Sequence, residues 1–126
     1  ETEKAIKAID KDITIIAVAQ VYCPDCRATV PFLKKFSDLN SKIKIDYRSR
    51  EAAKEFFSDT DERIKIPTLI SYVDGKYKTF WNEFPAVVKK KMDENPENFE
   101  DIKYNFRIGK FNVEIEKELV DYLTSL

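Results

Sequence analysis

Residues 13–39 read ITIIAVAQVYCPDCRATVPFLKKFSDL and join two hydrophobic patterns at a pair of cysteines. Residues 13–22 are almost continuously apolar and rich in β-branched side chains, which predicts a strand buried on both faces. After the first cysteine the period becomes helical, and the apolar face consists of Ala28, Phe32, Phe36 and Leu39. We expect this helix to begin at Pro24, where a missing N–H costs nothing, and to kink at Pro31.

The remainder of the first half continues this alternation of strand and helix. Residues 1–10 are consistent with a short amphipathic helix, residues 43–47 alternate like a strand, and residues 51–58 resemble a second helix. The order β-α-β-α predicts parallel strands joined by a right-handed crossover.

The second half is different because it predicts a hairpin followed by helices. Residues 68–73 and 76–81 are strand candidates, and the Asp74-Gly75 pair between them favours a two-residue turn. Helices are expected at about 84–92, 97–106 and 113–126. Their default role is core packing, because Phe99, Ile102 and Phe106 share one helical face. The lysine run 89–91 is expected to be a solvated helix face.

Composition excludes several classes of function. The chain has 126 residues, the usual size of one domain, and its net charge of -1 gives no general reason to bind nucleic acid or a membrane surface. It contains no histidine, which excludes Cys-His nucleophile pairs and histidine metal sites, and only two glycines, which excludes glycine-rich phosphate loops. No apolar stretch approaches the roughly 18 residues of a membrane-spanning helix.

The chemistry-bearing motif is Cys23-Pro24-Asp25-Cys26, which lies where a buried strand ends and a helix begins. A helix N-terminus presents unpaired N–H groups and a partial positive charge, which favour a thiolate over a thiol. The spacing lets the two sulfurs bond, with the first facing outward and the second partly covered by the first turn. Cys23 is therefore the expected attacking sulfur, and Cys26 would then attack Cys23 and release the reduced substrate.

A CxxC pair can also bind zinc or form a structural disulfide. A CxxC pair is commonly half of a four-cysteine zinc site, but here the other two ligands would have to come from a second chain. A structural disulfide would close too short a loop to stabilise the chain much.

The ordered set of motifs resembles the thioredoxin superfamily between about Ile13 and Trp81. The set comprises the apolar strand before CxxC, a proline eight residues after the first cysteine, an Ile66-Pro67-Thr68 run and the Asp74-Gly75 hairpin. The resemblance implies an α/β fold, a thioredoxin-like three-layer α/β/α sandwich with a mixed central sheet. We expect a single domain over 1–126, with its core at about 13–81 and a helical extension at about 84–126.

The resemblance also implies roles for residues around the cysteines. Ile66 would pair its backbone with an extended substrate, and Pro67 would be a cis-proline that shields the cysteines from metal capture. The family usually has Trp immediately before the first cysteine and a buried acid six residues before it, where this chain has Tyr22 and Ala17.

Two further departures concern charge and length. Pro24 and Asp25 replace the family's usual Gly-Pro, and the Asp25 charge should disfavour thiolates and make the pair a better reductant than oxidant. An acid in the first turn also suits the helix dipole. The longer C-terminus, with the runs 81–85 and 107–111, resembles a bacterial thioredoxin-like subgroup.

The expected function is reduction of protein or small-thiol disulfides by a monomer without cofactor or metal. A reductase or a low-molecular-weight thiol would supply electrons. The alternatives are a non-catalytic adaptor on the same fold, and a metal or iron–sulfur carrier that shares the CxxC between two chains. Cysteine usage fits a reducing cytoplasm, while an extracytoplasmic location stays open because the chain begins at Glu1 rather than Met.

Overall fold

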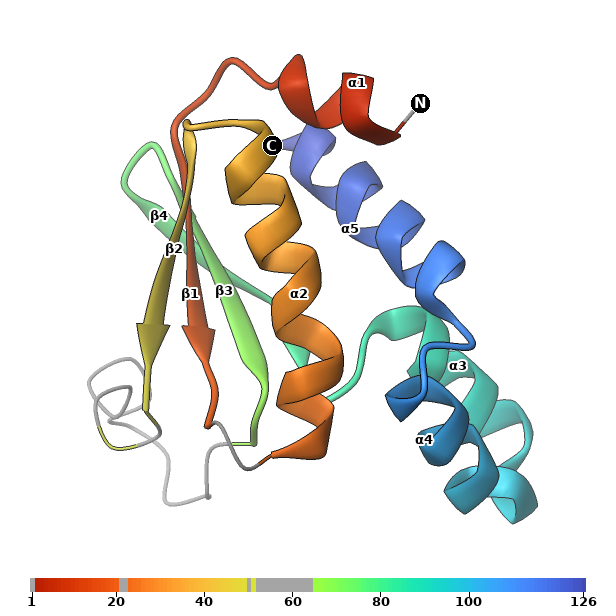
Figure 1. The fold of residues 1–126 in the computed structure, drawn as a ribbon. Coiled ribbons are helices and arrows are strands. Elements are labelled where there is room, and N and C mark those ends of the chain that lie inside the picture. The colour runs from red at the N-terminus through yellow and green to blue at the C-terminus, as the bar shows by residue number, and fades with distance from the viewer. Residues whose placement is uncertain (1, 21–22, 50, 52–64) are drawn as a thin grey trace.

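A mixed four-stranded sheet with helices packed against it forms the protein (Figure 1). The computed structural model describes residues 2–20, 23–49, 51 and 65–126. The strands, in the order β2-β1-β3-β4 across the sheet, are β1 (Ile13–Val18), β2 (Ile43–Arg48), β3 (Thr68–Val73) and β4 (Lys76–Asn82). The β1–β2 pair is parallel, whereas β3 runs antiparallel to both β1 and β4. The α/β fold class with a mixed sheet is thus confirmed.

Strand β1 lies in the middle of the sheet, as its apolar sequence predicts. Apart from Thr14, which is half-buried, all its residues are buried. The strand ends at Val18, however, and not at residue 22. Residues 21 and 22 lie outside the described part of the chain, as does almost all of the helix expected at 51–58.

Helix α2 (Pro24–Leu39) crosses the face of the sheet and begins at Pro24 as predicted. Pro31 lies inside it, and the helix continues to Leu39. The short helix α1 (Thr2–Lys7) and the last helix α5 (Asn112–Ser125) lie beside α2 (Figure 1). The core is buried between the sheet and these helices, and its fully buried members include Ile6, Ile15, Leu33, Phe36, Leu69, Trp81, Ile115 and Leu119. Burying side chains of this size is the main favourable term for the fold.

The turn between β3 and β4 has the geometry that its sequence predicts. Asp74 and Gly75 have φ values of 54° and 80°, which place both in the left-handed region. Two-residue hairpins need this region because it matches the twist of the flanking strands.

The C-terminal extension consists of α3 (Ala86–Glu94), a 3-10 turn η2 (Pro96–Asn98), α4 (Phe99–Arg107) and α5. These bounds lie within about two residues of the predicted ones. Gly109, with a φ of 88°, joins α4 to α5, and a Cβ there would lie 2.9 Å from Asn112 Nδ2. The left-handed conformation just after a helix is the usual place for glycine.

Side-chain contacts tie the extension to the sheet and to itself. Tyr122 in α5 shares a 2.7 Å hydrogen bond with Ser71 in β3, and its ring stacks on Phe80 with centroids 4.4 Å apart. The Glu118 carboxylate accepts hydrogen bonds from the first backbone N–H groups of α3, those of Ala86 and Val87. The extension is therefore packed as part of the same body.

The predicted apolar face of α4 is confirmed at two positions and wrong at the third. Ile102 and Phe106 are buried, whereas Phe99 is 39% exposed. Phe99 is the first residue of the helix, and its ring lies at 90° to that of Phe84, with centroids 6.5 Å apart. In the lysine run, Lys89 and Lys90 are exposed as predicted, and Lys91 forms an ion pair with Glu114. None of the described helices is long and apolar enough to cross a bilayer.

Phe106→Ala should destabilise the protein by about 3–5 kcal/mol, because it removes a fully buried ring that packs on Trp81 and Phe84. Tyr104→Ala is the matched control, since Tyr104 lies on the same helix and is 61% exposed. It should change stability by less than about 0.5 kcal/mol. Urea unfolding followed by fluorescence measures both, and equal losses would contradict the packing described for α4.

Candidate active site

The cysteine motif forms the first turn of α2 at the edge of the sheet where β1 ends. Cys23 is the N-cap of the helix, with extended backbone angles (φ -84°, ψ 117°). Pro24 is the first helical residue, where its fixed φ suits the helix and its missing N–H leaves no donor unsatisfied. The local sequence therefore places the first sulfur at the positive end of the helix dipole.

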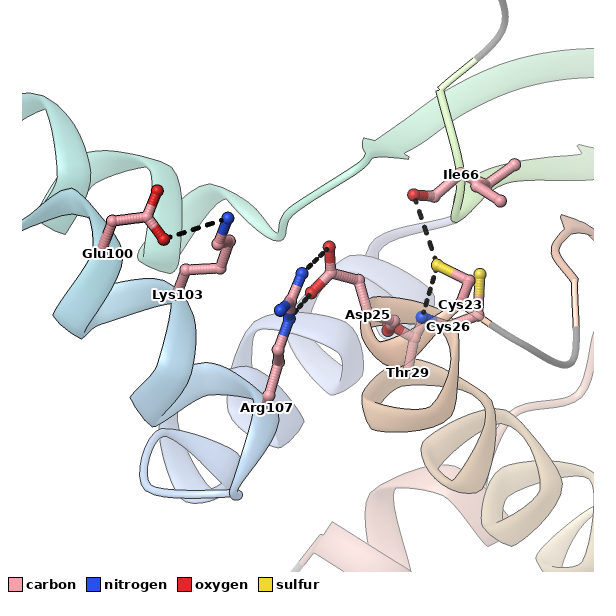
Figure 2. Close-up of polar contacts among 8 residues, drawn as sticks. All are labelled: Cys23, Asp25, Cys26, Thr29, Ile66, Glu100, Lys103 and Arg107. Carbon is pink, nitrogen blue, oxygen red and sulfur yellow. Dashed lines mark hydrogen bonds and ion pairs between the residues drawn. The ribbon is translucent and has the colours of Figure 1, made fainter.

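The Cys23 sulfur faces two backbone groups (Figure 2). The Cys26 N–H donates to Cys23 Sγ at 3.3 Å, so the sulfur takes the place of a capping oxygen. On the other side, Sγ lies 4.0 Å from the carbonyl oxygen of Ile66. An N–H that points at the sulfur favours its anionic form, because hydrogen bonding to a charged group stabilises that charge.

The two cysteines are unequal in their surroundings. Both are free thiols, and Cys23 is 9% exposed whereas Cys26 is 2% exposed. Burial raises the pKa of the Cys26 thiol to about 12, and the Cys23 sulfur and the Asp25 charge add to this rise. Cys26 is thus held protonated near neutral pH.

The loop before β3 holds Ile66 against the cysteines. The Ile66–Pro67 peptide bond is cis, and Pro67 is buried. The Glu83 N–H donates to the Pro67 carbonyl oxygen at 2.7 Å, which ties the loop to the chain just after β4. Ile66 thereby has a fixed position beside Cys23.

Asp25 is buried inside the motif and forms an ion pair that the sequence reasoning missed. Its carboxylate is directed at Arg107, the last residue of α4 (Figure 2). Arg107 Nε donates to Oδ1 at 2.7 Å, and Nη2 donates to Oδ2 at 3.4 Å. A buried carboxylate needs a partner, so the burial of Asp25 was the one available signal, and it appears only once the fold is known.

The structure therefore brings six of the predicted site residues together, namely Cys23, Pro24, Asp25, Cys26, Ile66 and Pro67. Tyr22 lies outside the described residues. Ala17 is fully buried in β1 beside Leu69, so the family's buried acid has no counterpart at that position. In the described part of the chain, no group of three or more acidic or cysteine side chains is arranged to hold a metal ion.

The thioredoxin family model Thioredoxin_9 matches residues 1–103, and the chain therefore belongs to the thioredoxin superfamily. The match includes the whole sheet, the cysteine motif and the first half of α4. None of the curated proteins matches the sequence. The family and the cysteine pair together are consistent with a redox role.

Two solved structures show the same fold. A protein of unknown function from Pseudomonas aeruginosa is 17% identical, with a TM-score of 0.70 over 98% of this chain and 70% of that one. An HIV epitope scaffold, also 17% identical, has a TM-score of 0.73 over 97% of this chain and 70% of that one. Oxidised thioredoxin from Plasmodium falciparum is 17% identical over 73% of this chain and 86% of that one, with a TM-score of 0.46.

Limiting iodoacetamide at about pH 8 should alkylate Cys23 well before Cys26 in the reduced protein. The raised pKa of Cys26 keeps that sulfur protonated and unreactive, and its rate should rise only as the pH approaches about 12. Peptide mass spectrometry resolves the two sites if trypsin is replaced by a protease that cleaves at Asp. Unfolded protein in urea is the control, where both cysteines should react at similar rates. Equal rates in the folded protein would contradict the inequality of the two thiols.

Proposed function

We propose that the protein is a thiol–disulfide oxidoreductase that reduces disulfides through a Cys23–Cys26 dithiol–disulfide cycle. The observation that carries this proposal is the position of Cys23 Sγ, between the N–H of Cys26 and the carbonyl of Ile66. The Cys26 N–H stabilises the anion of the nucleophile, and the backbone of Ile66 offers an adjacent edge for the substrate.

In the first step the Cys23 thiolate attacks one sulfur of the substrate disulfide. A bond forms between Cys23 and that sulfur, and the substrate's other sulfur leaves as a thiolate, which takes a proton from water. An extended substrate would lie beside Ile66, as the resemblance to the family implies. Cys23 is suited to this step because it is the more exposed residue of the pair.

In the second step Cys26 attacks Cys23 and closes the protein disulfide. The Cys26 proton passes to the departing substrate sulfur, so that the substrate has gained two electrons and two protons in all. Because its pKa is raised, Cys26 stays protonated and does not compete with Cys23 for the incoming disulfide. The same raised pKa makes deprotonation of Cys26 the energetically costly part of this second step.

The cycle requires a donor of electrons that returns the disulfide to the dithiol. A separate reductase or a low-molecular-weight thiol would serve, and the substrates would be protein or small-thiol disulfides. The Asp25 charge inside the motif supports net reduction, since a negative charge near the sulfurs disfavours thiolates and so favours the disulfide.

Cys23→Ser should abolish reduction of insulin disulfides with dithiothreitol as the donor, because it removes the attacking sulfur. Cys26→Ser should retain the first step and accumulate a mixed disulfide with the substrate, visible on a non-reducing gel and in the intact mass. Lys34→Ala is the matched control, since Lys34 is exposed on the same helix and should leave the rate unchanged.

Full activity of Cys23→Ser would contradict the proposal. If neither the wild type nor Cys26→Ser forms a mixed disulfide, and partner binding is insensitive to redox state, the adaptor alternative is favoured. If anaerobically purified protein carries metal and dimerises with it, the carrier alternative is favoured.

A further inference from the structure

We propose that Arg107, in the C-terminal extension, is a positioning residue of the redox site that holds Asp25 and stabilises the reduced form of the Cys23–Cys26 pair. On this view α4 sets the balance between dithiol and disulfide. The inference rests on the proposed function and adds to it a residue far along the chain from the motif.

The contact between Arg107 and Asp25 is a two-point ion pair at a partly buried place. The Asp25 side chain is 9% exposed and that of Arg107 is 34% exposed. The Nε–Oδ1 distance of 2.7 Å and the Nη2–Oδ2 distance of 3.4 Å match the fork by which arginine binds carboxylates. Without Arg107, Asp25 would be a buried carboxylate with no charged partner among the described residues, which is costly.

The charges around the sulfurs give Arg107 its effect on the redox pair. Asp25 opposes negative charge on the cysteines, because its carboxylate lies inside the motif. Arg107 offsets this charge, and its own pKa is raised, first by the hydrogen bond with Asp25 and to a lesser degree by the charge of Cys23. The guanidinium therefore interacts favourably with a Cys23 thiolate, which exists only in the reduced protein.

The packing of α4 fixes the guanidinium at this place. Phe106, the neighbouring residue, is fully buried against Trp81 and Phe84. Gly109 then turns the chain with a φ of 88°. One turn earlier, Lys103 pairs with Glu100 at 3.2 Å, and the Glu100 charge acts on Arg107 from the same helix. Among the described residues, the charged groups at this ion pair are Asp25 from α2, Arg107 from α4 and, behind it, Glu100.

Thermodynamic linkage makes this interaction reciprocal. If Arg107 stabilises the thiolate of the reduced protein, reduction must strengthen the hold of α4 on the motif by the same free energy. Oxidation leaves Asp25 as the remaining negative partner of Arg107 within the motif.

The test is the equilibrium between dithiol and disulfide in glutathione buffers, measured for the wild type, Arg107→Gln, Asp25→Asn and the double variant. Arg107→Gln should shift the equilibrium toward the disulfide by about threefold to tenfold, where tenfold corresponds to about 30 mV. Asp25→Asn should shift it toward the dithiol. In the Asp25→Asn background, Arg107→Gln should have a smaller effect than in the wild type, because Asp25 positions the guanidinium.

Lys103→Gln is the matched control, since it removes the same charge from the same helix at a residue paired with Glu100. It should leave the equilibrium within about 1.5-fold of the wild type, because the Lys103 ammonium pairs with Glu100 and not with the carboxylate of the cysteine motif. An Arg107→Gln shift no larger than that of Lys103→Gln, or strictly additive effects in the double variant, would overturn the inference. If Arg107→Gln does not fold, Arg107→Met, which keeps an unbranched apolar stem without the charge, replaces it in the test, and an unchanged equilibrium in that variant is the contradicting result.

The outcome separates this inference from the proposed function. A wild type that forms no intramolecular disulfide refutes the proposed function. A wild type with a reversible disulfide whose equilibrium is insensitive to Arg107 refutes the positioning role alone.

Discussion

The first turn of α2 must place one sulfur at the helix N-terminus while it buries a carboxylate between the two cysteines. Cys23 meets this requirement as the N-cap, where the Cys26 N–H donates to its sulfur at 3.3 Å. Asp25 meets it through Arg107, which reaches the carboxylate from α4. The position of β1 sets where this turn begins, and the packing of α4 sets where its countercharge lies. Sheet and extension are both needed to build the site.

Within the C-terminal extension, helix α4 therefore has two physical roles. Phe106 and Ile102 are buried in the core, and Arg107 reaches the cysteine motif. A residue next to a buried anchor is held more firmly than one on a mobile surface, because displacing it would expose the anchor. The proximity of Phe106 and Arg107 therefore makes the stability of α4 and the electrostatics of the site depend on the same packing.

Local patterns in the sequence predict much of the fold and the cysteine site. The apolar run before Cys23, the helical period after it and the Asp74-Gly75 turn each depend on neighbouring residues, so they can be read directly. The Asp25–Arg107 pair cannot, because the two residues are 82 positions apart and neither carries a periodic signal for the other. The end of β1 at Val18 was also missed, since the apolar pattern continues beyond the last paired residue. Phe99 fits the helical period of α4 but lies at its first position, where the core no longer covers it.

The most direct test of the central claim is a redox titration of the wild-type chain against glutathione and dithiothreitol buffers, with alkylation and intact mass as the readout. We expect a reversible two-electron transition in which the Cys23–Cys26 disulfide replaces the dithiol. A midpoint near about -270 mV would mark a general reductant, whereas one between about -180 and -120 mV would indicate an isomerase or oxidase. A chain that never forms this intramolecular disulfide in any buffer would contradict a redox role for the cysteine pair.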